Sequence, residues 1–266
     1  MKIRIPLCLF ASLLVTTCVD AYGWRAKAFP ADPHNIVITP LIDAFRFHAD
    51  PVSTWYLDQL DGSLVSRQRF LTFSTAVARA TYAAFEYTYI KDGVSRTRIY
   101  YSMSGQDEPP TDLPRSGSPL SSYFVEDATR IHAYMAETDE SLITWTQTED
   151  DDTGYRHKRD AEFKAVRSIE RDIRRGIVTR DGTLQAFVSQ PMCDSCEHVM
   201  HQLGRLYGVN INVAYLEGNM SQAYRQFRLM LNRYMDTLLV RVNEPRRGGP
   251  TPPPPATTMC ARIFSQ

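Results

Sequence analysis

Cysteine is scarce in this chain of 266 residues, which contains only five. Two of them, Cys8 and Cys18, lie within the first 21 residues, so a chain that loses that segment keeps three. An exported protein that folds on disulfides usually has an even number of cysteines. The odd number favours a thiolate function for the close pair Cys193 and Cys196, with Cys260 as a spare.

An excess of charge of either sign is also absent, because 30 acidic residues balance 30 basic ones. A chain without net charge has no global field that would draw it onto nucleic acid or an anionic membrane. Any contact with nucleic acid must therefore be local.

The apolar stretch at the N-terminus, Ile5 to Val15, is too short to span a bilayer. It follows the positive charges of Lys2 and Arg4, and Val19-Asp20-Ala21 places small residues where a signal peptidase would cut before Tyr22. This layout predicts a signal peptide over residues 1–21, export, and no membrane span after cleavage. Two alternatives stay open: an uncleaved anchor, and a lipoprotein that uses Cys18.

Three segments are rich in residues that disfavour regular structure. The tail, 245–266, contains Pro252 to Pro255 and is typical of a flexible, partly polyproline extension. Gln106 to Ser122 is rich in Pro, Ser, Gly and Asp and is expected to form a long surface loop. The acidic run Glu149 to Asp152 is expected to be a solvated loop.

The N-terminal region, residues 22–80, mixes short apolar runs with prolines and contains no motif. Ser66 to Ala80 is its best candidate for a helix. The region is expected either to pack on the main domain or to serve as a small accessory segment.

From residue 81 onward the pattern becomes regular. Tyr82 to Ile90 and Thr97 to Met103 flank Lys91-Asp92-Gly93, which predicts a β-hairpin. Apolar residues at helical spacing or in alternation then predict, in order, helix 160–173, strand 183–189, helix 193–207, strand 209–215, helix 224–234 and strand 238–242. Crossover helices between strands imply an α/β domain over residues 81–244, with a five-stranded, largely parallel mixed sheet between layers of helices.

Two short strings carry candidate chemistry at the starts of the first two of these helices. They are Asp160-Ala161-Glu162 and Pro191-Met192-Cys193-Asp194-Ser195-Cys196. Helix N-termini favour thiolates and carboxylates, which are the forms that bind Zn²⁺. Asp160, Cys193 and Cys196 can form a three-ligand set that leaves a fourth position for water, as in catalytic zinc sites. Glu162 is the candidate proton shuttle, and both acids can face the metal only if Asp160 lies at the irregular helix entrance.

Simpler interpretations exist for each string. A lone Cys-x-x-Cys is often a redox pair or half of a structural zinc site, and His198 or His201 could close such a site. Acids at a helix start are common because they cap the helix. His157 is either a replacement ligand or a solvated loop histidine. Basic residues gather around the first helix, where they would suit phosphate contacts or form a solvated face: Arg156, Lys158, Arg159, Lys164, Arg167, Arg171, Arg174 and Arg175.

Taken in order, the two strings resemble the motif of the cytidine-deaminase-like superfamily, a ligand-x-Glu string on one helix followed by Pro-Cys-x-x-Cys on the next. The resemblance covers Tyr82 to Val242 and looks closest to the bacterial polymorphic-toxin deaminases, in which the first ligand can be Asp. It implies a three-layer α/β/α fold. It also implies Asp160, Cys193 and Cys196 as zinc ligands, Glu162 as general acid and base, and Ser104, Gly105 and Ser189 in the substrate pocket.

The sequence departs from the family pattern in two places: Asp160 stands where His is usual, and Met192 separates Pro191 from Cys193. A carboxylate in place of an imidazole makes the site more negative, so a bound water should be less acidic and activity reduced or lost.

The resemblance implies a secreted zinc-dependent deaminase, a toxin or effector that acts on cytosine in single-stranded or duplex nucleic acid or in nucleotides. A toxin would also need an immunity protein as a partner in the cell that makes it. The competing expectation is a non-catalytic exported binding protein in which Cys193 and Cys196 form a disulfide or a structural zinc site.

Overall fold

The computed structural model describes seven segments of the chain: 23–29, 36–61, 66–107, 119–135, 140–144, 157–218 and 221–243. Several predicted features lie outside them: the signal peptide, residues 108–118 of the predicted loop, the acidic run 149–152, and the tail with Cys260. Within the described residues, no helix is long and apolar enough to cross a membrane.

The described elements alternate strands and helices through most of the chain. In order they are β1 (Trp24–Phe29), α1 (Ile38–Asp61), α2 (Arg67–Arg79), β2 (Tyr82–Lys91), β3 (Val94–Met103), the 3₁₀ turn η1 (Leu120–Tyr123), β4 (Arg130–His132), the 3₁₀ turn η2 (His157–Arg159), α3 (Ala161–Arg174), β5 (Thr183–Val188), α4 (Asp194–Tyr207), β6 (Asn210–Leu216) and α5 (Gln222–Asn243).

The strands form one mixed sheet in the order β1-β6-β5-β2-β3-β4. Strands β1, β6 and β5 run parallel to one another, and β2 is antiparallel to both of its neighbours. The β2–β3 turn consists of Asp92 and Gly93, whose φ angles of 54° and 74° fit the tight two-residue turn of a hairpin. The α/β class and the mixed sheet expected from the sequence are therefore confirmed.

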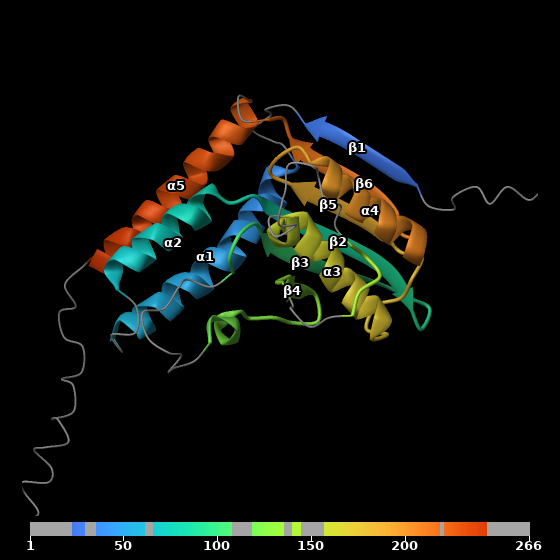
Figure 1. Cartoon of the computed structure of the whole chain (residues 1–266), viewed down its shortest axis with the longest axis horizontal. Helices are drawn as coiled ribbons and strands as arrows, with labels where there is room; N and C mark the ends of the chain where they lie inside the picture. Colours follow the sequence, from blue (N-terminus) through green and yellow to red (C-terminus); the bar gives the residue numbers. More distant parts are fainter. Residues whose placement is uncertain are drawn as a thin grey trace, which may run out of the picture.

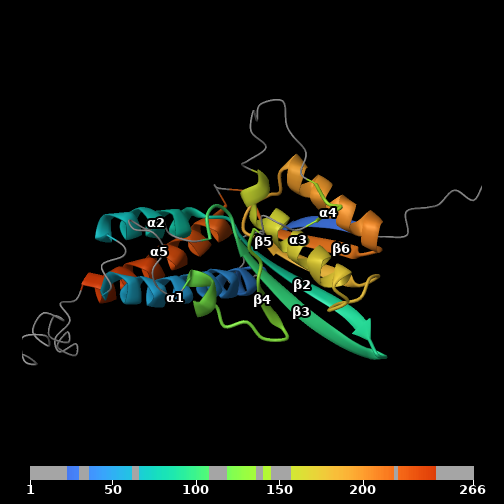
Figure 2. The ribbon, with the colours of Figure 1, turned by 60° about the horizontal axis from the view of Figure 1, so that its bottom comes forward.

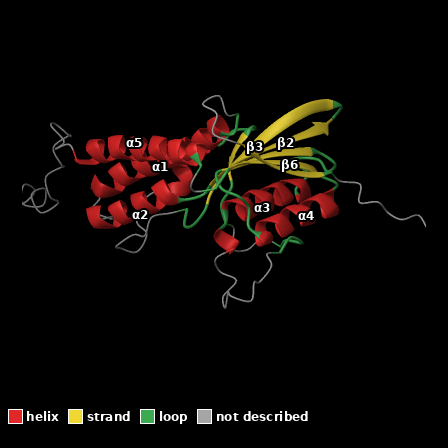
Figure 3. Cartoon of the chain, turned by 90° about the horizontal axis from the view of Figure 1, so that it is seen from above, coloured by secondary structure: helices red, strands yellow, loops and turns green. Residues whose placement is uncertain are grey.

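Helices lie along one face of the sheet and against one end of the other face (Figures 1 and 3). Helices α3 and α4 lie on one face and α1 on the other, and α2 and α5 pack beside α1 beyond the end of the strands (Figure 2). Alternating residues of β2 serve the two layers, since Tyr82 and Ala84 join the α1 core whereas Ala83 and Phe85 join the α3–α4 core.

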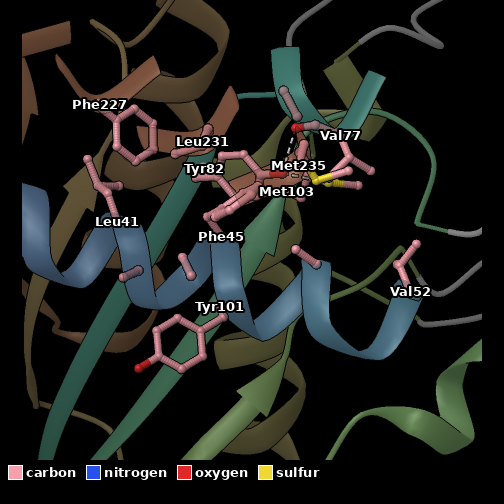
Figure 4. Close-up of a cluster of buried hydrophobic side chains, with 14 of the residues drawn as sticks. Leu41, Phe45, Val52, Val77, Tyr82, Tyr101, Met103, Phe227, Leu231 and Met235 are labelled. Carbon is pink, nitrogen blue, oxygen red and sulfur yellow. Dashed lines mark hydrogen bonds between the residues drawn. The ribbon is translucent and has the colours of Figure 1, made fainter. Parts of the chain in front are cut away.

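The core on the α1 side is rich in aromatic rings (Figure 4). Tyr82 lies at its centre, where its hydroxyl donates to the Val77 carbonyl at 2.7 Å and contacts the Met103 sulfur at 3.3 Å. Phe45 packs edge-on against Tyr82 with ring centroids 5.5 Å apart. This core joins the N-terminal helices to the first strand of the regular domain.

Helix α3 is buried on almost every side, including its polar residues Glu162, Lys164, Glu170 and Asp172. The segment 140–144 covers its outer face, where the Leu142 amide donates to Glu170 at 2.8 Å. Asp172 accepts from the Tyr100 hydroxyl at 2.8 Å. Buried acids at these positions are satisfied by fixed donors, so α3 is held firmly in place.

The predicted strand over residues 238–242 is wrong, because these residues continue α5 to Asn243. Leu238 is buried and Val240 is exposed, so their alternation does not mark one face of a strand. The sheet has six strands, not five, because β1 and the short β4 join it. Strand β1 comes from the predicted accessory region and pairs with β6 from Trp24 to Phe29.

The other predicted elements are confirmed within a residue or two at most boundaries. The hairpin is β2–β3, and the helices expected from 160 and 193 are α3 and α4. Gly208 ends α4 with a φ of 67°, as its role as a C-terminal cap required. The helix expected over Ser66 to Ala80 is α2, with the Ser66 hydroxyl accepting from the Arg69 amide.

Candidate metal centre

Two helices begin side by side at one edge of the sheet. Strand β5 ends at Val188 and leads through a short turn to α4, while β3 ends at Met103 and the Gly105 amide donates to the Arg159 carbonyl at 2.9 Å. This last hydrogen bond ties the end of β3 to the residue that precedes Asp160. The edge where parallel strands end and helices begin is where α/β proteins usually bind ligands.

Asp160 is the N-cap residue of α3, with the extended backbone angles φ −67° and ψ 141°. Its side chain makes no capping hydrogen bond to the helix. Instead, its Oδ2 atom lies 3.0 Å from His157 Nδ1 and 3.6 Å from Cys196 Sγ. Asp160 therefore does not cap the helix through its side chain. Its carboxylate lies at the irregular helix entrance, which is the position it needs if it and Glu162 are both to face a metal.

The two cysteines face each other across the first turn of α4. Their sulfur atoms lie 3.1 Å apart and both are free thiols. A hydrogen bond from the Cys196 thiol lowers the pKa of Cys193 to about 6 against the opposing effect of burial. The same interaction, together with burial, raises the pKa of Cys196. Cys193 is exposed and Cys196 is buried, so the pair offers one accessible sulfur and one fixed sulfur.

These distances fit a metal ion. In a tetrahedral zinc site, with Zn–S near about 2.3 Å and Zn–O near about 2.0 Å, a sulfur and an oxygen stand about 3.5 Å apart and two sulfurs about 3.8 Å apart. The Cys196–Asp160 distance of 3.6 Å matches the first value, and the sulfur pair at 3.1 Å needs only a small opening. His157, Asp160 and Cys193 also bring one ligand atom each within 4.8 Å of one another. The group can therefore hold a metal ion.

Glu162 lies on the first turn of α3, two residues after Asp160, and is 4% exposed. Burial, and then the charges of Asp160 and Cys193, raise the pKa of its carboxyl to about 7, while a hydrogen bond from Cys196 opposes the shift. A buried carboxyl that contacts a ligand and changes protonation state near neutrality has the properties of a proton carrier.

Comparison with known proteins gives no information about this site. The chain matches no family model, no curated protein and no solved structure. The roles of its residues are therefore argued from the geometry and chemistry of the donor set.

Of the three histidines that the sequence offered as metal ligands, the structure places His157 against Asp160. His157, on η2, is the histidine whose ring contacts Asp160. His201 instead packs against Trp24 of β1, with ring centroids 4.6 Å apart and the ring planes tilted by 41°, and His198 is exposed on α4. Among the described histidines, His157 is thus the one placed to take part in metal binding.

The three predicted substrate residues lie close to the same edge and take part in its backbone structure. The Ser104 hydroxyl accepts from the Thr81 amide at 2.8 Å, and the Ser189 hydroxyl accepts from the Tyr82 amide at 2.9 Å. Ser189 is 1% exposed. Gly105 has a φ of 89° and faces open space, a conformation that favours glycine. A substrate role stays a prediction for all three.

Lys164 is a structural residue of this site that the sequence assigned only to a basic cluster. Its side chain is 0% exposed, and its Nζ donates to the Met103 and Gly105 carbonyls and to Asp107, each within 2.8 Å. Burial lowers the pKa of this amine, and the charge of Asp107 opposes the shift. Lys164 therefore fixes the Ser104–Asp107 loop against α3. Only its pairing with Asp107 in the folded chain distinguishes it from the other basic residues of the cluster.

Several other residues of the predicted basic cluster are engaged within the protein. Arg167 lies over the Phe163 ring and 3.6 Å from Glu170. Arg171 lies over the Tyr134 ring at 5.3 Å, and Arg174 pairs with Glu140. These contacts account for the charges without a phosphate ligand.

Proposed function

We propose that this protein is a secreted zinc-dependent nucleobase deaminase, a toxin or effector that acts on cytosine in nucleic acid or nucleotides. The observation that carries the proposal is the convergence of Asp160 and Cys196, 3.6 Å apart, and of Cys193 and Cys196, 3.1 Å apart, with the buried Glu162 interacting with Cys196. Residues 33 or more positions apart in the chain meet in the order and on the elements that the deaminase motif requires.

The arrangement of elements supports the proposal. A β2–β3 hairpin precedes α3, β5 precedes α4, and both helices start at the same edge on one face of the sheet. This is the arrangement expected of a cytidine-deaminase-like domain, with β1 added to its β6 edge. A hydrolytic centre at the helix N-termini also benefits from the positive ends of two helix dipoles.

Each residue has a defined part in this proposal. Asp160, Cys193 and Cys196 hold the metal, and Zn²⁺ when bound supplies a Lewis acid that acidifies water for attack on the ring carbon bearing the amine. Glu162 would carry one proton of the attacking water to the adjacent ring nitrogen and then the remaining hydroxyl proton to the amine, so that the C–N bond breaks, a C=O bond forms and ammonia leaves. Lys164 holds the Ser104–Gly105 loop beside these groups.

Zinc is the metal that best suits the donor atoms, two cysteine sulfurs and one carboxylate oxygen. Thiolates select soft or borderline ions, and an exchange-labile ion without redox chemistry suits hydrolysis. Two thiolates and one carboxylate on Zn²⁺ give a net negative site, which should make the enzyme slower than one with a histidine ligand.

Export is part of the proposal and rests on the signal-peptide layout of residues 1–21. A secreted enzyme that edits nucleic acid would harm the cell that makes it, so an immunity protein is the expected partner. Sequencing the N-terminus of material recovered from culture medium tests export, with Tyr22 as the expected first residue.

The enzymatic assignment is tested by Glu162→Gln in the zinc-loaded full chain. We expect ammonia release from cytidine and cytosine oligonucleotides to fall at least about a hundredfold, because general acid and base catalysis contributes about 10²–10⁴-fold. Zinc content should stay at one equivalent. Glu140→Gln is the matched control, because Glu140 is exposed and pairs with Arg174 at the other end of α3. Unchanged ammonia release by Glu162→Gln would remove Glu162 from the mechanism.

The second candidate is a non-catalytic exported binding protein with a disulfide or a structural zinc site. It is favoured by the accessible Cys193 sulfur, 3.1 Å from Cys196, and by the presence of His157 as a possible fourth ligand. Metal analysis and thiol titration separate a disulfide from either zinc protein. Deamination assays then separate the enzyme from a structural zinc site.

A further inference from the structure

His157 is placed as a fourth donor to the metal centre. Its Nδ1 atom lies 3.0 Å from Asp160 Oδ2, and a ligand atom of His157 lies within 4.8 Å of a ligand atom of Cys193. With Zn–N and Zn–O bonds near about 2.0 Å, two such ligands stand about 3.3 Å apart on a tetrahedral ion. The 3.0 Å between His157 and Asp160 is a hydrogen-bond distance, and an opening of about 0.3 Å would bring the two atoms to the spacing of two ligands on one ion.

The four donors are not held equally firmly. Cys196 is buried in the first turn of α4, and Asp160 and Cys193 are the N-cap residues of α3 and α4. His157 belongs to the three-residue turn η2, which precedes α3 and lies outside both helices. Of the four, His157 is thus the donor that can leave with the smallest disturbance of the fold.

We propose that His157 is a fourth, displaceable zinc ligand that closes the metal centre at rest. The inference rests on the proposed function in one respect, because displacement matters only if a substrate or water must reach the ion. A closed His-Asp-Cys-Cys set is a complete tetrahedral site, and withdrawal of His157 opens one position without loss of the other three ligands.

X-ray absorption spectroscopy of the full chain with one equivalent of zinc tests the proposal without relying on activity. An imidazole ligand produces a characteristic multiple-scattering pattern. We expect two sulfur ligands, one oxygen and one imidazole in the wild type, and loss of the imidazole pattern with retention of both sulfurs in His157→Ala. His198→Ala is the matched control and should keep the pattern, because His198 lies on the exposed side of α4.

The wild-type spectrum decides the matter even if a variant fails to fold. Bound zinc without an imidazole ligand would overturn the proposal, leave His157 as a hydrogen-bond partner of Asp160, and leave the deaminase assignment intact. An imidazole pattern that survives in His157→Ala would also overturn it. A zinc-free chain overturns both this proposal and the metal centre.

Deamination assays separate the two proposals. If zinc carries the His157 ligand but neither the wild type nor His157→Ala releases ammonia, the enzymatic assignment fails and the closed site stands. If the chain is a deaminase, His157→Ala should release ammonia at least several-fold faster, because one position is permanently open. Slower release by a variant that retains zinc would contradict the displaceable role.

Discussion

Asp160 lacks its ordinary local hydrogen bond, at some cost to local stability. An aspartate at an N-cap usually accepts a hydrogen bond from the helix, and loss of such a cap costs about 1 kcal/mol. Asp160 has the N-cap position and backbone angles but directs its carboxylate to His157 and Cys196. A side chain held away from its ordinary local partner is consistent with selection for ligand binding.

A pair of buried histidines at the α1–β4 contact forms a second unusual feature of single residues. His48 and His132 have ring centroids 5.1 Å apart, and the His132 ring stacks on Phe124 at 3.7 Å. Within the described part of the chain, neither Nε2 atom has a hydrogen-bond partner. Burial lowers the pKa of His48 to about 4 and that of His132 well below its usual value, against the influence of Asp107 on His48 and with that of Lys164 on both.

Acid should therefore destabilise the fold through these two residues. Because both pKa values are lower in the folded chain, the unfolded chain binds more protons, and stability falls as the pH drops below about 6.5. For His48 alone the loss between about pH 7.5 and about pH 5 is about 2 kcal/mol. Urea titrations at the two pH values, monitored by circular dichroism, measure this loss of unfolding free energy.

His48→Leu should weaken this pH dependence, whereas His198→Leu, a change on the exposed side of α4, should leave it as in the wild type. Equal pH dependence in all three proteins would exclude His48 as the source.

The positions of the two strings could be predicted because helix starts are marked by local sequence and each string lies at one. Asp160 and Cys193 precede clear helical stripes, so α3 and α4 and their first residues followed from spacing alone. The contact between His157 and Asp160, and the bonds of Lys164 to the loop after β3, depend on how elements pack and carry no local signal.

Strand β1 was missed, and the end of α5 was taken for a strand, for physical reasons. Strand β1 has six residues with no long apolar run, so pairing with β6 decides its structure. In α5, Phe227, Leu231, Met235 and Leu238 are all buried at helical spacing, and this stripe outweighs the short β-like alternation near the end of the helix. Tertiary packing overrode the local pattern in both elements.

The close approach of β2 and β5 predicts a sensitive glycine. A Cβ atom at Gly182 would lie 2.7 Å from the Thr88 carbonyl and 2.5 Å from the Tyr87 ring. Gly182→Ala should therefore lower the free energy of unfolding by about 3 kcal/mol, since the backbone of β2 must move. Gly218→Ala is the control, because its Cβ meets open space, and it should change stability by less than about 0.5 kcal/mol. Similar unfolding curves for both variants would show that the strands can separate freely.

At the scale of the whole molecule, the N-terminal region helps to complete the domain. Helices α1 and α2 supply much of the core on one face of the sheet, and β1 covers its β6 edge. Removal of these elements would expose the side chains of Tyr82, Tyr101 and Phe187, which are buried in the intact domain. Because this region contains no motif, its sequence left open whether it packs on the main domain or forms a small accessory segment, and the contacts of α1, α2 and β1 show that it packs.

A pair of fragments tests this dependence. Residues 22–244 should unfold cooperatively and bind one equivalent of zinc, whereas residues 81–244 should be insoluble or lack a cooperative transition, because an apolar sheet face meets water. Thermal unfolding and zinc titration measure both properties. A soluble 81–244 fragment that binds zinc as tightly as the longer one would show that the N-terminal elements are dispensable.

The central claim is that Asp160, Cys193 and Cys196 hold one zinc ion, and native mass spectrometry of the full chain, followed by fragmentation to locate the ion, tests it most directly. We predict one bound zinc that remains on the fragments containing Cys193 and Cys196, with both thiols unoxidised, and loss of zinc in Cys196→Ser. A metal-free chain lighter by two hydrogens, with a bond between Cys193 and Cys196, would contradict the account.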